Sequence, residues 1–496
     1  MSSDRRTLVV AGHGMVGHRL VELLVERGAT AEWDIVVFCE ERRLAYDRVG
    51  LSTFFAGSTP EELSLVAPGF FDAVGLDVRV GDAVVTVDRE RSVVVSARGD
   101  TVPYDALVLA TGSSPFVPPV PGTDLPGCFV YRTLDDVEAI REWGGLCRVG
   151  AVVGGGLLGL EAANALRQLG LETHVVEFAP RLMPMQVDDG GGEVLRRRIE
   201  DLGVIVHTSM QTTEIAAGPD GRVATMRFSE GDDLTVDMVV FSAGIRPRDE
   251  LARACGLEVG ERGGIVVDDA CRTSDPRIYA VGECALAAGK VWGLVSPGYR
   301  MAAVVADRLL GGTAEFTGAD MSAKLKLMGV DVACFGDAFG TTLGSESVTF
   351  ADPVSRVYKR LVVGDGGTRV LGGILVGDAT AYQSLLQMAR GDMPTPDHPA
   401  ELLFPNRRAG AGATGVAALA ESATICSCNN VSKGAVCAAV AEGGLTETGQ
   451  VKEATRAGTG CGGCVPLVTE LLKDALRTAG VEVADHLCEH FAYSRQ

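Results

Sequence analysis

Four cysteines near the end of the sequence have a spacing that suits a metal centre. Cys426 and Cys428 form a C-x-C pair, and Cys461 and Cys464 form a C-x-x-C pair after 32 intervening residues. Zinc sites favour pairs with two to four residues between the cysteines, whereas ligation by thiolates alone is typical of [2Fe–2S] clusters. The spacing therefore favours a [2Fe–2S] cluster, with zinc or disulfides as the alternatives. A zinc or redox-sensing module would have a regulatory or scaffold role.

A glycine loop near the start has the spacing of a dinucleotide-binding loop. The run G-H-G-M-V-G follows the apolar residues 7–11 and opens an amphipathic stretch over residues 15–27. In such loops the first glycine permits a tight turn, the second lets a pyrophosphate approach, and the third lets helix and strand pack closely. The helix N-terminus offers N–H groups to the phosphates, and an acid after the next strand, 35–39, should hold a ribose hydroxyl. A strand–helix turn without a ligand is the alternative. The residues expected to bind are Gly12, Gly14, Met15, Gly17, Glu40 and Glu41.

A second glycine loop, G-G-G-L-L-G, has the same setting. It follows the apolar residues 149–153, and the next expected strand ends at Glu177. An acid here accepts from the 2′-OH of NAD and repels the 2′-phosphate of NADP, so we expect NADH to be preferred over NADPH. Arg181 follows a proline and is expected to be solvated or structural. The residues expected to bind are Gly154, Gly156, Leu157, Gly159 and Glu177.

The elements around the two loops predict a doubly wound α/β fold. Each loop lies in a strand–loop–helix–strand unit, and two such units imply two Rossmann-like domains. The Pro-rich stretch from Pro115 suggests a crossover, and residues 234–241 and 263–281 are expected to be strands that return the chain to the first domain. Residues 318–400 have the pattern of mixed strands with a helix near 380–390. We expect a first nucleotide-binding domain (1–116 and 245–315), a second (117–244), an α+β C-terminal interface domain (316–404), a linker (405–422), a Cys-rich domain (423–475) and a tail (476–496).

The composition argues against several functions. Lys and Arg total 45 and Asp and Glu total 65, a net charge of −20, which argues against binding to nucleic acid or to an anionic membrane. No apolar run approaches the ~20 residues that a membrane span needs. The first residues run directly into a strand, which leaves no room for a signal peptide. We therefore expect a cytoplasmic protein.

The remaining cysteines predict no further redox centre. No cysteine lies between Cys39 and Cys128, so we expect neither a redox dithiol nor a single reactive thiol there. Cys437 is expected on the core face of a helix. The H-x-C-x-H run at 486–490 fits no standard metal site, which favours a solvated or partner-contacting tail over a metal-binding one. Its polar members are His486, Cys488 and His490.

Five segments resemble the flavoprotein reductases that have two dinucleotide-binding domains, a glutathione-reductase-like fold. They are GHGMVG, YDALVLATGS, GGGLLGLEAA, FSAGIRP and IYAVGEC. The resemblance implies FAD in the first domain and NADH in the second. It implies a catalytic role near the nicotinamide for Glu161, for which the alternative is a first-turn helix carboxylate favoured by the helix dipole. The family usually has Asp at the position of Glu283. Further cofactor-binding residues implied by the resemblance are Arg48, Val84, Ala110, Thr111, Gly112, Arg132, Gly244, Gly282 and Glu283.

The surroundings of the four clustered cysteines resemble the small helical [2Fe–2S] domain related to bacterioferritin-associated ferredoxin. The whole chain resembles the family of NADH-dependent assimilatory nitrite reductase large subunits, through FCEERRLAYDRVGLS, SAKLKLMGVDV, AGTGCGGCVPLV and LCEHFAYSRQ. This implies that electrons pass from NADH through FAD and the [2Fe–2S] cluster to a sirohaem centre. In that family a sirohaem and [4Fe–4S] region follows. Here the sequence ends at Gln496, so we expect either a shortened chain or a separate reductase protein.

Two other activities stay open on the sequence. A stand-alone NADH:ferredoxin or rubredoxin-type reductase has the same nucleotide sites, whereas an NADH oxidase that releases peroxide would leave the Cys-rich domain unexplained. The acceptor is accordingly a sirohaem domain or a small redox protein. The resemblance also allows a small nitrite reductase subunit and a second copy of the chain as partners.

Overall fold

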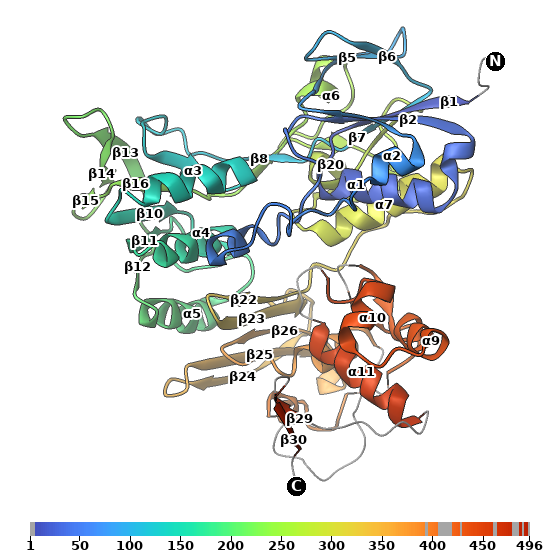
Figure 1. Ribbon diagram of the computed structural model, residues 1–496. Coiled ribbons are helices and arrows are strands. Elements are labelled where there is room, and N and C mark those ends of the chain that lie inside the picture. Colours follow the sequence, from blue (N-terminus) through green and yellow to red (C-terminus); the bar gives the residue numbers. More distant parts are fainter. Residues whose placement is uncertain are drawn as a thin grey trace. The chain divides into compact units, whose positions relative to one another are not determined.

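The computed structural model describes residues 5–391, 395–404, 419–426, 429–459, 464–478, 486–488 and 491–494. The chain divides into two compact units, shown in Figure 1 with the colours of the sequence. The first unit contains Met1–Met185 and Arg196–Met321, and the second contains Gln186–Leu195 and Ser322–Gln496.

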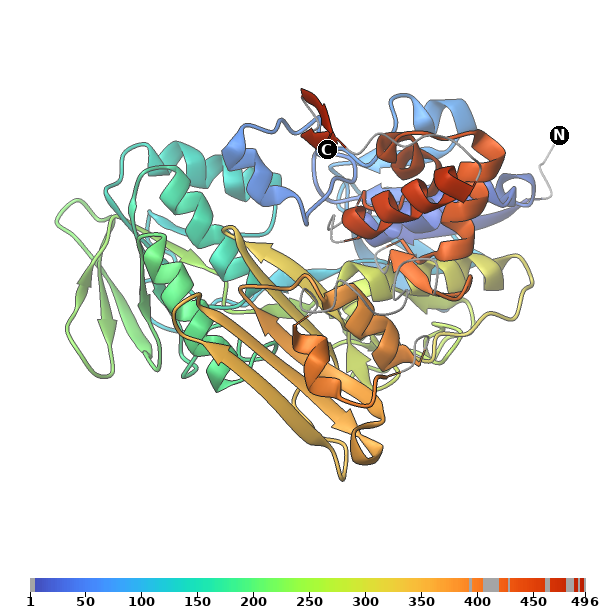
Figure 2. The same ribbon diagram turned by 90° about the horizontal axis from the view of Figure 1, so that it is seen from below.

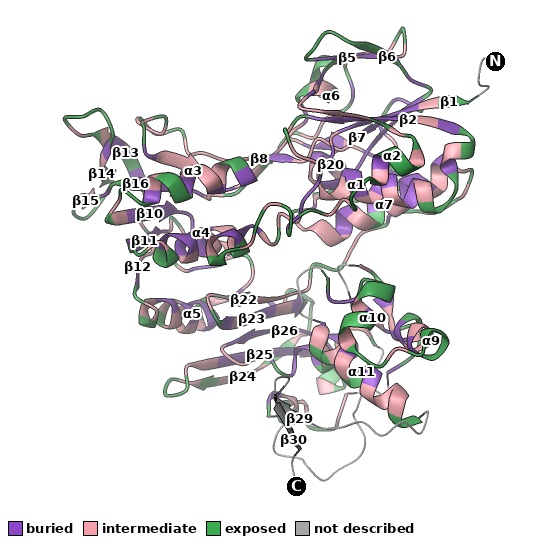
Figure 3. Cartoon of the chain, viewed as in Figure 1, coloured by how far each residue is buried: buried purple, intermediate pink, exposed green. Residues whose placement is uncertain are grey.

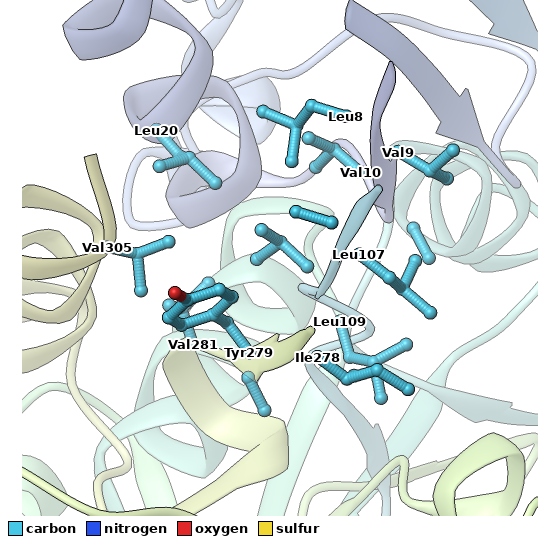
Figure 4. Packing of buried hydrophobic residues seen from close by; sticks show 14 of the residues in the cluster. Leu8, Val9, Val10, Leu20, Leu107, Leu109, Ile278, Tyr279, Val281 and Val305 are labelled. Carbon is cyan, nitrogen blue, oxygen red and sulfur yellow. The ribbon is translucent and has the colours of Figure 1, made fainter. Parts of the chain in front are cut away.

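The first unit contains a five-stranded parallel sheet in the order β19–β7–β1–β2–β3. Leu8, Val9 and Val10 are fully buried, as expected of a parallel sheet covered on both faces. Figure 4 shows these side chains in one cluster with Leu20 and Val305. Helices α1 and α7 supply the last two residues and contact each other. The bounds are β1 (Arg6–Ala11), α1 (Met15–Glu26), β2 (Trp33–Cys39), β3 (Asp77–Val80), β7 (Ala106–Leu109), β19 (Ile278–Ala280) and α7 (Val295–Leu309).

A second five-stranded parallel sheet has the order β12–β11–β10–β16–β9. Because β16 pairs with β10 in this sheet, the expectation that residues 234–241 return the chain to the first domain is wrong. The apolar run predicts a buried strand but does not say which sheet it joins; β19 is the strand that returns to the first sheet. The bounds are β9 (Cys128–Val130), β10 (Val149–Val153), α4 (Leu157–Gln168), β11 (Glu172–Val176), β12 (Val204–His207) and β16 (Met238–Phe241).

Short antiparallel strands complete the first unit. Strand β8 follows the first sheet in the chain and β17 follows β16, and the two pair antiparallel where the chain crosses between the sheets. Pro115 lies in β8, which agrees with the predicted crossover. The remaining elements are α2 (Phe70–Val74), β4 (Val84–Asp88), β5 (Val93–Ser96), β6 (Thr101–Pro103), β8 (Ser113–Pro115), α3 (Leu134–Gly144), β13 (Thr212–Ala217), β14 (Val223–Phe228), β15 (Leu234–Thr235), β17 (Ile245–Pro247), α6 (Glu250–Ala254), β18 (Ile265–Val266), β20 (Ala285–Ala287) and β21 (Lys290–Val291); α5 (Asp189–Asp201) spans a boundary between the units.

The second unit combines an antiparallel sheet, in the order β22–β23–β26–β25–β24, with a helical module. Helix α8 packs against β26, and helices α9, α10 and α11 contact one another, as Figure 2 also shows. One hydrophobic cluster contains Phe335 of the sheet, Tyr382 of α8, and Val436 and Leu471 of the module, and Figure 3 shows the buried residues in purple. The bounds are β22 (Ala323–Leu327), β23 (Val330–Gly336), β24 (Glu346–Asp352), β25 (Val357–Gly364), β26 (Arg369–Val376), α8 (Tyr382–Arg390), β27 (Thr424–Cys426), β28 (Val431–Ser432), α9 (Lys433–Gly443), α10 (Thr448–Thr455), α11 (Val465–Thr478), β29 (His486–Cys488) and β30 (Phe491–Ser494).

Two Rossmann-like sheets, an α+β part and a helical module confirm the predicted fold class. Within the described part of the chain, no helix combines the length and the apolar character that crossing a membrane requires.

Candidate dinucleotide and cluster sites

The first glycine loop joins β1 to α1, and two of its glycines are required by the protein itself. Gly12 has φ +114°, and a Cβ there would overlap the carbonyl oxygen of Ala110. A Cβ on Gly17 would overlap the carbonyl oxygen of Gly12. The turn and the close approach of α1 to the sheet therefore explain the first and third glycines.

The second glycine of this loop has no such explanation within the protein. Gly14 has φ −83°, which any residue adopts, and a Cβ there would meet nothing within 4 Å. It precedes α1 as the N-cap, and no side chain caps the helix. Free N–H groups and room beside a missing Cβ are what a pyrophosphate needs at a helix N-terminus. The loop thus fits the pyrophosphate of a dinucleotide.

The second glycine loop repeats this arrangement between β10 and α4. Gly154 has φ +115°, and a Cβ there would overlap the carbonyl oxygen of Ser242, while one on Gly159 would overlap that of Gly154. Gly156 has φ −78°, precedes α4 without a side-chain cap, and has no atom within 4 Å of its Cβ position. This loop therefore also fits a pyrophosphate.

The predicted ribose-binding acids lie at the carboxyl ends of the second strands of the two sheets. Glu177 follows β11 and is oriented by backbone groups: Gly155 N donates to its Oε2 (2.5 Å) and Ala179 N to its Oε1 (2.6 Å). Glu40 follows β2, and both of its oxygens accept from Arg248, with 3.0 Å between Arg248 Nη2 and Glu40 Oε1. This guanidinium holds the pKa of Glu40 below its ordinary value.

Two arginines that were predicted to bind the first cofactor, Arg48 and Arg132, are each paired with a glutamate. Arg48 pairs with Glu41, which also accepts from the hydroxyl of Tyr46 (2.7 Å). Arg132 donates to Glu283 at 2.5 Å. Together with the Arg248–Glu40 pair, these contacts bring together five residues that the sequence predicted. Arg248 itself was missed, because it lies 208 residues from Glu40 and no spacing rule connects them.

Glu161 lies on α4, past its first turn. Its Oε2 is buried and has no hydrogen-bond partner among the described residues, as is true of the hydroxyl of Tyr131. Burial, with a smaller contribution from the charge of Asp47, raises the pKa of Glu161 to about 7. Because α4 has no acidic residue in its first turn, Glu161 is not a first-turn helix carboxylate, and its role near the nicotinamide stays a prediction. The carboxyl can hold or release a proton near neutral pH.

Most of the other predicted cofactor residues follow the carboxyl ends of strands, where open α/β sheets bind their ligands. Thr111 Oγ1 donates to the carbonyl of Arg248 (2.6 Å), which fixes the backbone of that arginine. The side chain of Val84 lies in the hydrophobic core, so only its backbone could contact a ligand. Ala110, Thr111 and Gly112 follow β7, Gly244 follows β16, Gly282 and Glu283 follow β19, and Met15 and Leu157 are the first residues of α1 and α4.

The Cys-rich module is described in part. Cys426 ends β27 and Cys464 directly precedes α11, and both are buried, whereas Cys428 and Cys461 lie outside the described residues. Asn429 Nδ2 donates to the carbonyl of Arg456 (2.6 Å) and to Thr459 Oγ1 (3.1 Å), which joins the loops that carry the two cysteine pairs. The donor set of four thiolates fits a [2Fe–2S] cluster.

The structure tests the prediction for Cys437 but not the one for the H-x-C-x-H run. Cys437 lies on α9, partly buried against the core, as predicted. The side chains of the H-x-C-x-H run lie outside the described part of the structure. None of the scattered cysteines Cys39, Cys128, Cys147, Cys255, Cys271 and Cys284 forms a disulfide.

Residues 6–308 match the family of pyridine nucleotide-disulphide oxidoreductases, and residues 424–474 match the BFD-like [2Fe-2S] binding domain. The chain belongs to the pyridine nucleotide-disulphide oxidoreductase family. The two matches imply FAD, NADH and a [2Fe–2S] cluster as cofactors, in agreement with the prediction.

Relatives extend the similarity over the whole chain. The nitrite reductase (NADH) large subunit of Escherichia coli is 52% identical over 99% of this chain, and the nitrite reductase [NAD(P)H] large subunit of Klebsiella oxytoca is 55% identical over 99%. The chain spans 58% and 51% of the lengths of these two relatives. A crystal structure of a ferredoxin reductase from Rhodopseudomonas palustris is 30% identical, with a TM-score of 0.69 over 76% of this chain and 93% of that one.

Proposed function

We propose that these 496 residues form the NADH-oxidising, electron-transferring part of an assimilatory nitrite reductase. The observation that carries the proposal is the presence, in one chain, of two glycine loops that are open at their second glycine and a four-cysteine module. The first loop would bind FAD and the second NADH. Bound FAD accepts an electron pair from NADH and gives up electrons singly, which is the form in which a [2Fe–2S] cluster carries them.

The residues around the first loop would hold FAD in this proposal. The free amides at the start of α1, beside Gly14, would bind the pyrophosphate, and Glu40 would accept from the adenosine ribose. Arg48, Arg132 and Glu283 would line the path toward the isoalloxazine ring. The proposed FAD domain comprises residues 1–116 and 245–315.

The residues around the second loop would bind NADH. Gly156 and the start of α4 would receive the pyrophosphate, and Glu177 would accept from the 2′-OH of the ribose. Because Glu177 is already oriented by two backbone N–H groups, a 2′-phosphate would meet a fixed carboxylate. This supports a preference for NADH over NADPH. The proposed NADH domain comprises residues 117–244.

Glu161 would contact the nicotinamide. Its buried Oε2 lacks a partner among the described groups, and a pKa of about 7 lets it donate or accept a hydrogen bond at that atom. A carboxamide offers both an N–H donor and a carbonyl acceptor, so this carboxyl can orient the ring in either protonation state.

Electrons would leave through a cluster held by Cys426, Cys428, Cys461 and Cys464. The proposed acceptor is a sirohaem centre in a further region or in a separate protein, where nitrite would be reduced to ammonium. A small nitrite reductase subunit, a homodimer, the interface domain at 316–404, the linker at 405–422 and a cytoplasmic location are parts of the same proposal.

The second candidate is a stand-alone NADH:ferredoxin or rubredoxin-type reductase. The similarity to a ferredoxin reductase over 76% of this chain and 93% of that protein favours it. The Cys-rich module favours nitrite reductase, because relatives carrying that name match 99% of this chain.

The test is an anaerobic purification followed by reduction with NADH. We expect a yellow-brown protein with one flavin, two irons and two sulfides per chain, a rhombic electron paramagnetic resonance signal after NADH, and reduction of ferricyanide but not of nitrite. A colourless protein that cannot be reconstituted with flavin would refute the proposal. Zinc in place of iron would assign the Cys-rich module a scaffold role. Reduction of nitrite by these 496 residues would refute the proposal that the electron acceptor is a sirohaem centre outside them.

A further inference from the structure

Two buried histidines at the first glycine loop have no part in the proposed function so far. His13 lies between Gly12 and Gly14, and His18 lies one turn into α1. They are 5% and 3% exposed, and their rings meet edge to face with centroids 5.2 Å apart. A polar ring buried this deeply needs hydrogen-bond partners, and all four ring nitrogens have one.

The partners define the direction of each hydrogen bond. The backbone N–H of Ala45 can only donate, so His13 Nδ1 accepts from it (3.2 Å) and the proton of His13 lies on Nε2. His13 Nε2 then donates to His18 Nδ1 (3.3 Å), and His18 Nε2 donates to the carbonyl of Leu65 (3.1 Å). One chain of three hydrogen bonds thus runs from Ala45 to Leu65 through the two imidazoles, and the carboxylate of Glu22 lies 3.7 Å from His18 Nε2.

The two ends of this chain lie on neighbouring segments that are paired with each other. Leu65 N donates to Ala45 O (3.0 Å), and Asp47 N donates to Leu63 O (2.8 Å). Between these bonds lies an antiparallel bridge of Tyr46 with Ser64. We call residues 45–47 and 63–65 the two-strand ladder. The histidines therefore hold both strands of the ladder against the glycine loop.

The ladder carries groups that matter at the proposed sites. Asp47 is the charge that contributes to the raised pKa of Glu161. Arg48 follows directly and donates to the carbonyl of Arg132 (3.0 Å) as well as to Glu41. A shift of the ladder relative to the loop would therefore move charged groups at both proposed nucleotide sites.

We propose that His13 and His18 are positioning residues that fix the two-strand ladder, and with it Arg48, on the loop that binds the FAD pyrophosphate. The inference rests on the proposed function, because it assumes FAD at the first glycine loop. Phe71 and Phe70 pack edge-on against the two rings, at centroid distances of 5.3 Å from His13 and 5.7 Å from His18, and both histidines are buried. The buried bonds are therefore costly to break.

The test separates the two contacts of His13 in the whole chain. His13→Asn keeps an acceptor in place of Nδ1, and His13→Gln keeps a donor in place of Nε2, whereas His13→Leu keeps neither. The dissociation constant of FAD is measured by titrating the flavin-free protein. We expect an increase of about tenfold or more for His13→Leu and smaller increases for the two amide variants.

Two comparisons make the result decisive. His18→Leu breaks the same chain, so the double variant His13→Leu/His18→Leu should weaken FAD binding no more than either single variant. His174→Leu removes the buried member of another histidine pair, in the second sheet, whose partner His207 is half-buried and lies 3.0 Å away, and it should leave FAD binding unchanged.

The experiment distinguishes failure of the proposed function from failure of the positioning role of the two histidines. Absence of FAD binding by the wild-type chain would overturn the proposed function. If the wild type binds FAD and the three His13 variants bind it equally tightly, or if the effects of the two histidines add, the positioning role is wrong. Should His13→Leu fail to fold, the Asn and Gln variants decide, since each retains one of the two bonds.

Discussion

In the second glycine loop, folding requires Gly159, whereas only a bound ligand would require Gly156. The variants Gly156→Ala and Gly159→Ala test this difference. In Gly156→Ala the new methyl group meets no protein atom within 4 Å and the backbone keeps its ordinary φ of −78°. Loss of chain entropy in the unfolded state stabilises such a variant by about 0.4–1 kcal/mol. The poorer N-cap offsets this by a similar amount. The folded state should therefore change in stability by less than about 1 kcal/mol.

The same methyl group should weaken NADH binding strongly. It occupies the space through which a pyrophosphate would approach the free amides of α4, and each charge-assisted hydrogen bond is worth about 1.5–3 kcal/mol. Loss of one or two such bonds raises the dissociation constant of NADH by about 10- to 100-fold or more. In Gly159→Ala, by contrast, the Cβ would overlap the carbonyl of Gly154, so the cost appears in folding, at about 1–3 kcal/mol or more.

The assay combines thermal unfolding with NADH-dependent ferricyanide reduction. Gly156→Ala should keep its melting temperature within a few degrees and its FAD content, because the first loop is untouched, while its KM for NADH rises. Gly159→Ala should melt earlier or fail to accumulate. An unchanged KM for Gly156→Ala, or a loss of stability as large as that of Gly159→Ala, would refute the assignment of this loop to the pyrophosphate.

Three further predictions follow from single contacts. Arg248→Gln removes the partner of Glu40 and should weaken FAD binding about tenfold in ultrafiltration assays, while Arg246→Gln, whose guanidinium stacks on Phe116 instead, should not. Wild type should have a higher kcat/KM for NADH than for NADPH. Glu177→Gln should decrease the ratio of the NADH value to the NADPH value at least tenfold. Equal kcat/KM values for the two nucleotides in the wild type would contradict the role of Glu177. Because the folded pKa of Glu161, about 7, is raised above its ordinary 4.5, the carboxyl costs stability as pH rises from 4.5 to 7. Glu161→Gln should accordingly be about 3 kcal/mol more stable than wild type in chemical unfolding at pH 8, with little difference at pH 4 and a slower reduction by NADH.

The sequence predicts well what depends on neighbouring residues. The strand, glycine loop and helix at 6–26 and again at 149–168 follow one another in the chain, so their pattern is visible without the fold. The steric need for Gly12 and Gly154 arises in the same short turns. The Pro-rich crossover is also local, since its conformation depends on the prolines themselves.

The sequence pattern did not predict contacts between segments that are distant in the chain. The partner of Glu40 lies 208 residues away, and the two-strand ladder meets His13 across 32 residues. The apolar run 238–241 identifies a buried strand, but only the pairing of Val239 and Val240 with the second sheet decides where it lies. Hydrophobic patterning specifies that a strand is buried, and the choice of sheet depends on which edge the rest of the chain leaves open.

The charge of the chain limits how it can bind two anionic dinucleotides. With a net charge of −20 it offers no general attraction, and the three arginines near the first loop are each paired with a glutamate. In the proposed function the pyrophosphates would be stabilised mainly by the free N–H groups at the starts of α1 and α4, neither of which has a side-chain cap. In this proposal, specificity for the rest of each dinucleotide would rest on the acids that follow β2 and β11, Glu40 and Glu177, and on the residues that hold them in place.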